Sequence, residues 1–364
     1  MKRGTNSTLM KEHNKKLILN LIRQERLSRA NIATQIGLTR ASVTILMEEL
    51  MREGFVAEEE SDYAGVGRRP VYLTLRKDAG YAIGVNISRH AYRLGLANLA
   101  GELLETRECR KMERQSYEIV REIAAQVRYL ANEARGGRVI GVGVSTPGPV
   151  DYKTNTILNP PSFPGWHDCE IGRRLSELCG LPVRLENVAN AAALAESYFG
   201  ECTNEENYAF LMVDEGIGAG IVTDGKLYRG KNGYGNELGH TSIRFDGLPC
   251  ECGNTGCLEA YASVPNLLKG TPYATWREAS EDADVVRREA GYLSCAIVNL
   301  VNLFDLNRIV LGGDIAENGK QLAQMIEAEI NGRIITNNRV EVCLCRPVDK
   351  AAVAASIALN SLFR

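Results

Sequence analysis

A cluster of three cysteines and one histidine constrains the fold more than any other feature of this sequence. The segment reads N-E-L-G-H, then nine residues, then C-E-C-G-N-T-G-C-L-E, which places four side chains within 18 positions: His240, Cys250, Cys252 and Cys257. One imidazole and three thiolates bind Zn²⁺ tetrahedrally and leave no open position for water. The alternative is four unrelated residues, since free cysteine often packs as a small hydrophobe. The glycine-rich spacing favours a structural zinc loop over residues 240–259.

The same segment resembles the signature of the ROK family, whose members are sugar kinases and sugar-responsive transcription factors. The matching pattern is E-x-G-H followed by C-x-C-G-x-x-G-C-x-E, and the resemblance extends over roughly residues 80–364. It implies a two-lobed α/β body of the actin, Hsp70 and sugar-kinase type. We expect lobe 1 at residues 78–190, with a C-terminal helix at 350–364 packing back on it, and lobe 2 at residues 191–349. Strand–helix alternation alone predicts only a two-lobed α/β fold.

The first 77 residues predict a winged helix-turn-helix domain. A first amphipathic helix is indicated by the apolar stripe of Leu17, Ile18, Leu21 and Ile22. Ser28 and Gly37 suit the start and end of a second helix, and Thr39 and Gly54 suit those of a third. The short G-L-T connection between them is typical of a helix-turn-helix. The segments F-V-A-E-E-E and P-V-Y-L-T-L then predict the two strands of a wing.

In such a domain the third helix enters the major groove of DNA with its N-terminal residues at the base edges. The predicted reading face is therefore Thr39, Arg40, Ala41, Ser42 and Thr44. Arg40 suits bidentate pairing with guanine, and Arg68 and Arg69 in the wing suit the DNA backbone or minor groove. Residues 1–77 contain 14 Lys and Arg against 9 Asp and Glu, whereas the remainder contains 29 against 36. This asymmetry supports a basic module joined to an acidic body. A small helical docking domain is the alternative.

The family resemblance also implies a sugar site between the lobes. By that resemblance, sugar hydroxyls hydrogen-bond to Asn187, Glu237, His240 and Glu259, and the loop containing Asn159 and Trp166 forms a lid over the sugar. The zinc loop would hold His240 and Glu259 in register. Several convergent polar groups are needed because a hydroxyl buried without a partner costs free energy. The alternatives are ordinary surface carboxylates at 237 and 259 and a packing role for the tryptophan.

Three departures from the kinase pattern argue against phosphotransfer. ROK kinases carry E-N-D-x-N, in which the Asp is the general base, whereas this chain has Val188 at that position. Loss of such a base costs on the order of 10²–10⁴ in rate. The kinase D-x-G-G-T segment is replaced by N-I-S-R-H at 86–90, and Asp214 and Glu215 stand in the second phosphate loop, where they repel polyphosphate. No bound ATP is therefore expected, and a kinase that uses another base is the alternative.

We predict a sugar-responsive transcriptional repressor that is not an enzyme and resembles the branch of xylose and N-acetylglucosamine repressors. Its expected partners are operator DNA, a sugar effector and a second copy of the chain, as a homodimer or a dimer of dimers. The longest apolar runs fall far short of the roughly 20 residues that span a bilayer, so we expect no membrane partner. Three of the ten cysteines lie in the metal cluster. The other seven show no motif spacing, and we expect them to be reduced and mostly buried, which fits a reducing cytoplasm. A sugar-binding protein without DNA binding is a further alternative.

Overall fold

The computed structural model describes residues 7–60, 71–110, 115–134, 136–160, 163–231, 233–335 and 337–363. Three helices open the chain: α1 (Ser7–Gln24), α2 (Arg29–Ile36) and α3 (Arg40–Arg52). Both predicted helix starts are confirmed, since the Ser28 side chain accepts the N–H of Asn31 and the Thr39 side chain accepts that of Ser42. Gly37 ends α2 with a left-handed φ of 68°, a conformation that glycine adopts without steric cost.

Helix α1 packs with a different face from the predicted one. Ile18 and Ile22 are buried as expected, but Leu19 is also buried, whereas Leu17 is 37% exposed. The buried face includes Lys15, whose Nζ lies 3.2 Å from a Glu49 carboxylate oxygen on α3. The buried face of α1 thus includes a charged residue that pairs with α3, which apolar periodicity does not indicate.

A two-stranded antiparallel sheet follows α3, formed by β1 (Val56–Glu60) and β2 (Val71–Leu75) with Val56 opposite Leu75. Leu73, on β2, is buried and pairs with Leu27, the residue that precedes the α2 cap. The sheet thus closes the helical core from one side. The intervening segment, which contains Arg68 and Arg69, lies outside the described residues.

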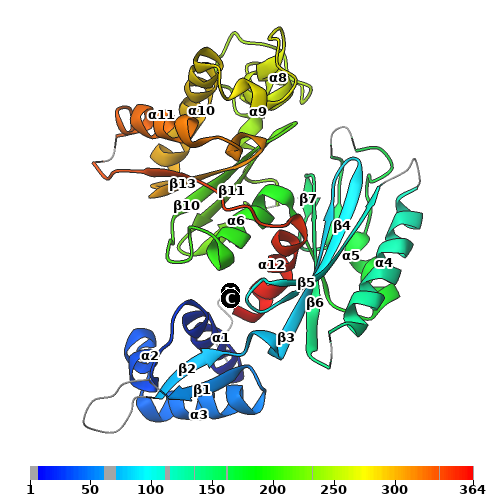
Figure 1. Ribbon diagram of the computed structural model, residues 1–364, viewed down its shortest axis with the longest axis vertical. Coiled ribbons are helices and arrows are strands. Elements are labelled where there is room, and N and C mark those ends of the chain that lie inside the picture. Colours follow the sequence, from blue (N-terminus) through cyan, green and yellow to red (C-terminus); the bar gives the residue numbers. More distant parts are fainter. Residues whose placement is uncertain are drawn as a thin grey trace. The chain divides into compact units, whose positions relative to one another are not determined.

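The body contains two five-stranded sheets with the same strand order (Figure 1). The first has the order β5-β4-β3-β6-β9 and comprises β3 (Gly80–Ile87), β4 (Ala91–Asn98), β5 (Leu103–Arg110), β6 (Arg138–Thr146) and β9 (Val183–Asn187). The second has the order β12-β11-β10-β13-β14 and comprises β10 (Tyr208–Val213), β11 (Ile217–Thr223), β12 (Lys226–Tyr228), β13 (Arg308–Gly313) and β14 (Glu341–Leu344). In each sheet a three-stranded meander precedes two further strands, so the two sheets repeat one topology.

The remaining elements are connections, covering helices and a short hairpin. The helices are α4 (Ser116–Asn132), α5 (Ile171–Cys179), α6 (Val188–Phe199), α7 (Glu259–Ala262), α8 (Val264–Leu268), α9 (Trp276–Ala279), α10 (Ala283–Phe304), α11 (Lys320–Asn331) and α12 (Lys350–Phe363). The hairpin is β7 (Val150–Asp151) with β8 (Thr156–Ile157). Within the described residues there are also three 3₁₀ turns: η1 (Lys77–Ala79), η2 (Leu238–His240) and η3 (Asp314–Ala316).

Internal contacts divide the chain into two units. The first comprises residues 1–144, 171–184 and 350–364, and the second comprises 145–170 and 185–349. Residues 145–170 and 185–190, which the sequence places in lobe 1, therefore belong to the second unit. Residues 188–190 form the first turn of α6, which packs on β10 and β11, and residues 185–187 directly precede that helix.

Helix α12 packs back on the first sheet, as the sequence predicts for the C-terminus (Figure 1). The contact is close enough to require glycine on the strands. A Cβ at Gly84 would lie 1.8 Å from the carbonyl oxygen of Ala351, and one at Gly143 would lie 2.0 Å from that of Ala354. Small residues on both sides thus let helix and sheet backbones approach closely. None of the described helices has the length and apolar character needed to cross a membrane.

Candidate functional site

The predicted metal ligands converge in the structure. The ligand atoms of His240, Cys250, Cys252 and Cys257 all lie within 4.8 Å of one another. The Cys250 sulfur is 3.7 Å from His240 Nδ1, and the Cys252 and Cys257 sulfurs are 3.7 Å apart. A tetrahedron with metal–sulfur bonds of about 2.3 Å has edges of roughly 3.8 Å, so this donor set fits a single tetrahedral metal ion.

Backbone pairing builds this loop around its ligands. Residue 242 pairs with Cys257 and residue 249 with Thr255, which folds the segment into a hairpin. The side-chain nitrogen of Asn254 donates to the carbonyl oxygen of His240 at 3.2 Å and reaches the Cys257 sulfur at 3.4 Å. Burial raises the pKa of the Cys257 thiol to about 12, and a bound cation would favour its thiolate instead.

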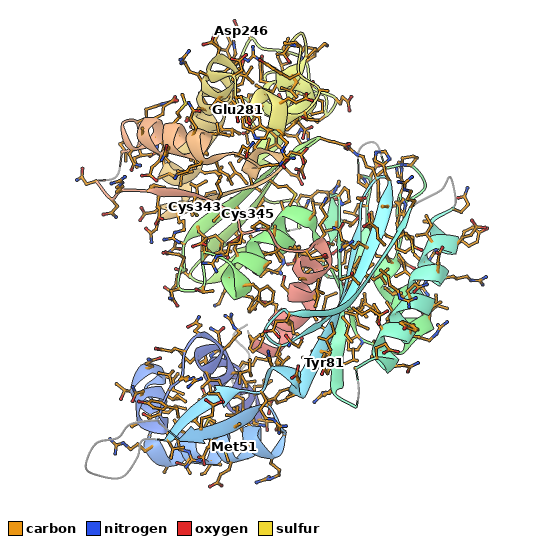
Figure 2. The ribbon with its side chains drawn as sticks, viewed as in Figure 1. Met51, Tyr81, Asp246, Glu281, Cys343 and Cys345 are labelled. Atoms are coloured by element: carbon orange, nitrogen blue, oxygen red, sulfur yellow. The ribbon has the colours of Figure 1, made fainter. Side chains whose placement is uncertain are left out.

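The other seven cysteines lie outside this cluster. Cys169 and Cys202 are buried, and the remaining five are half-buried, including Cys343 in β14 and Cys345 directly after it (Figure 2). The expectation that these cysteines are mostly buried is therefore met by only two of them. None of the ten cysteines, all of which lie in the described part of the chain, forms a disulfide.

The predicted sugar residues at the zinc loop are coupled to one another. The pKa of Glu237 is raised, chiefly because surrounding protein atoms exclude solvent from its carboxyl group. The residue as a whole is nevertheless exposed at the surface. The negative charge of Glu259 raises this pKa further, and His240 lowers it. Since His240 turns Nδ1 toward Cys250, its other ring nitrogen remains for a ligand. Metal loop and candidate sugar residues are thus one structural unit.

Glu259 also fixes the glycine-rich hairpin between β10 and β11. Its Oε2 accepts the backbone N–H of Ile217 at 2.7 Å. A Cβ at Gly216 would lie 2.8 Å from the same oxygen, so glycine is required at this position for the contact. Glu259 is therefore half-buried and held in place, which argues against the alternative of an unattached surface carboxylate.

Asn187 lies at the junction of β9 and α6. Its Oδ1 accepts the N–H of Ala189 at 2.8 Å and so caps the helix that Val188 begins. Val188, at the position of the kinase base, is half-buried in the first helical turn. In the loop predicted as a lid, Asn159 is exposed, but Trp166 is only 2% exposed and stacks on Phe163 with ring centroids 5.5 Å apart. Trp166 therefore packs within the loop.

A carboxylate fills the space between the two glycine-rich turns at the kinase phosphate position. Asp214 Oδ1 accepts the N–H of Asp314 at 2.6 Å, and a Cβ at Gly313 would lie 2.4 Å from that oxygen. The sequence predicts that Asp214 repels polyphosphate. The structure adds that the Asp214 side chain accepts a backbone N–H of the second turn.

The predicted reading face of α3 is open to solvent. Val43, Leu46, Met47 and Leu50 point into the core. Thr39, Arg40 and Ala41 are exposed, and Ser42 and Thr44 are half-exposed. The sequence reasoning did not include Ile45, which is 57% exposed on the same helix. Among the described residues Arg40 forms no ion pair, so its guanidinium remains available.

The family follows from a match that covers most of the chain. The model of the ROK family matches residues 82–359. The chain belongs to the ROK family. It is 31% identical to the xylose repressor of Caldicellulosiruptor bescii, over 97% of this chain and 96% of that protein. The solved structure of a ROK family transcriptional regulator, described as a homologue of the Escherichia coli MLC protein, aligns with a TM-score of 0.82 at 25% identity and covers 97% of both chains.

Kinases of this family match less of the chain. The ROK hexokinase of Thermus thermophilus aligns with a TM-score of 0.66 at 30% identity and covers 77% of this chain but 97% of its own. Part of this chain thus aligns with almost the whole hexokinase, whereas the matched regulators align with nearly all of this chain. The alignments with the regulator and with the hexokinase both show the sugar-kinase-like fold of the body.

Proposed function

We propose that this protein is a sugar-responsive repressor of carbohydrate-utilisation genes that binds operator DNA through residues 1–77. The observation that carries the proposal is the whole-chain match to repressors, with an exposed helix α3 in the segment that precedes the residues matched by the family model. Helices α1–α3 and the β1–β2 pair have the order of a winged helix-turn-helix. In this role α3 lies in the major groove with Arg40 at a base edge, and Arg68 and Arg69 contact the DNA backbone or the minor groove.

The sugar site is proposed from Asn159, Asn187, Glu237, His240 and Glu259, all of which lie in the second unit. We assign zinc to the cluster because three sulfurs and one imidazole nitrogen within 4.8 Å match its preferred ligands. Zinc is structural in this role, since four protein ligands close its coordination. The ion would orient His240 and the start of α7, where Glu259 lies.

The response follows from differential affinity. A sugar that binds the operator-weak state more tightly than the operator-binding state shifts the population toward release. A homodimer is proposed because two half-sites one helical turn apart match a two-fold protein. Light scattering of the purified protein tests this, and a monomer both with and without operator would exclude it.

The absence of phosphotransfer is also a proposal. It rests on Val188 in place of the base and on the Asp214 carboxylate between the two glycine-rich turns. The protein is expected to turn over no ATP with any sugar of the panel below. Steady phosphorylation of one sugar by the wild-type protein would overturn this.

A thermal-shift screen tests the ligand. The names of the matched repressors make D-xylose the first candidate. D-Xylose, N-acetylglucosamine, glucose and their phosphates are measured in separate wells, with ATP–Mg²⁺ in another. A specific sugar at a hundredfold excess over its Kd stabilises the fold by about 2.7 kcal/mol. Stabilisation by one sugar and none by ATP is the expected result, and stabilisation by ATP would favour the kinase.

A further inference from the structure

Asn236 directly precedes the candidate sugar ligand Glu237 and has an uncommon backbone conformation, with φ of +74°. Its side-chain nitrogen donates to Asn190 Oδ1 at 3.0 Å and to the carbonyl oxygen of Tyr228 at 2.7 Å. The first bond connects the loop before Glu237 to helix α6. The second closes the loop from residue 228 to 236 on itself.

Asn190 is in turn fixed by a buried ion pair. Glu186 is only 2% exposed, and its Oε2 accepts from Arg229 Nε at 2.7 Å. Its Oε1 accepts from the Asn190 side-chain nitrogen at 3.2 Å. A buried carboxylate requires such partners, because leaving the charge unpaired costs several kcal/mol. Arg229 and Glu186 thus provide a second connection between the same loop and the end of β9.

This arrangement determines which residue fits at position 236. The Asn190 amide must turn its nitrogen to the carboxylate, so its oxygen faces position 236 and requires a donor there. The left-handed φ is accessible to glycine, asparagine and aspartate, but of these three only asparagine has a side-chain donor. Backbone and hydrogen bonding therefore select the same residue.

We propose that Asn236 is a positioning residue that sets the place of Glu237 relative to Asn187. Asn187 follows Glu186 directly, and Glu237 follows Asn236, so the hydrogen bonds between 186, 190 and 236 connect the neighbours of both candidate ligands. The inference rests on the proposed sugar-binding role of Asn187 and Glu237. It deepens that role by naming what holds the two ligands in register.

Asn236→Asp is the sharpest single change, because it keeps the shape and the left-handed backbone but replaces the donor by an acceptor. The carboxylate would face two acceptors, Asn190 Oδ1 and the Tyr228 carbonyl oxygen. We expect the Kd for D-xylose to rise about tenfold or more, since both hydrogen bonds are lost and both acceptors are left unpaired. Operator affinity without sugar and zinc content should stay unchanged. Asn318→Asp makes the same change at an exposed left-handed asparagine (φ +56°) and should have no effect.

Reversal of the hydrogen-bond direction provides the rescue. In Asn236→Asp combined with Glu186→Gln, the Asn190 amide can turn over, accept from the introduced amide and donate to the introduced carboxylate. Each single variant is expected to bind D-xylose weakly, and the double variant should recover at least part of the affinity. Wild-type affinity in Asn236→Asp, or a double variant weaker than both singles, would overturn the inference.

Hydrogen exchange tests the positioning role of Asn236 without depending on which sugar binds. If wild-type protein does not bind D-xylose, the proposed ligand is wrong, but exchange in segments 233–240 and 183–199 still reports the connection. We expect faster exchange in both segments of Asn236→Asp and slower exchange again in the double variant. Exchange equal to wild type in both segments would overturn the positioning role.

Discussion

Replacing Cys257 with serine is expected to remove the bound zinc and, with it, the sugar response. Cys257 is fully buried, and its sulfur lies within 4.8 Å of the three other ligand atoms. Loss of a structural metal ranks among the largest single-site effects, so we expect the free energy of unfolding to fall by about 4 kcal/mol or more. Sugar affinity should fall about 10- to 100-fold because His240 and Glu259 lose their orientation. Elemental analysis, thermal unfolding and sugar titration measure the three effects.

Cys295→Ser is the matched control. Cys295 is a half-buried thiol of the same unit, outside the cluster. The change should leave zinc content and sugar affinity as in the wild type. A Cys257→Ser protein that retains stoichiometric zinc and responds normally to sugar would show that the cluster is not the metal site.

Replacing Arg40 with alanine is expected to remove most operator specificity. The guanidinium lies exposed at the N-terminus of α3 and forms no ion pair with described residues. A bidentate contact with guanine accounts for about 1–3 kcal/mol of discrimination, so specific affinity should fall about 5- to 150-fold. Binding to unrelated DNA, thermal stability and sugar affinity should change little. Binding to a duplex selected in vitro by the full-length protein, compared with a scrambled duplex, measures the effect.

Arg52→Ala tests whether position on the helix matters or only charge. Arg52 is exposed in the last turn of the same helix, away from the proposed base-reading end. Loss of this charge should weaken binding to both duplexes equally and modestly. Equal effects of Arg40→Ala and Arg52→Ala on specificity would show that α3 does not read bases with its N-terminal end. A loss of sugar affinity in Arg40→Ala would contradict separate DNA and sugar sites.

Much of the local structure could be predicted from the sequence because its causes are local. Ser28 and Thr39 cap the helices that they were expected to cap, since a cap depends on residues two or three positions away. The convergence of His240 with the three cysteines could be predicted for the same reason: 18 positions with two turn-forming glycines leave the chain few alternatives. The DNA-contacting, sugar-binding and dimer assignments remain proposals, because they depend on molecules that bind from outside.

The sequence by itself determined the family, the grouping of His240 with three cysteines, and the order of helices and strands in the first 77 residues, all of which depend on short spacings or on apolar periodicity. Only the tertiary structure decided which face of α1 is buried, where the two units divide, and what surrounds the sugar residues. The contacts between Arg229 and Glu186 and between Asn236 and Asn190 join residues more than 40 positions apart. No local pattern indicates such partners, since they meet only when β9, α6 and the loop after β12 have packed.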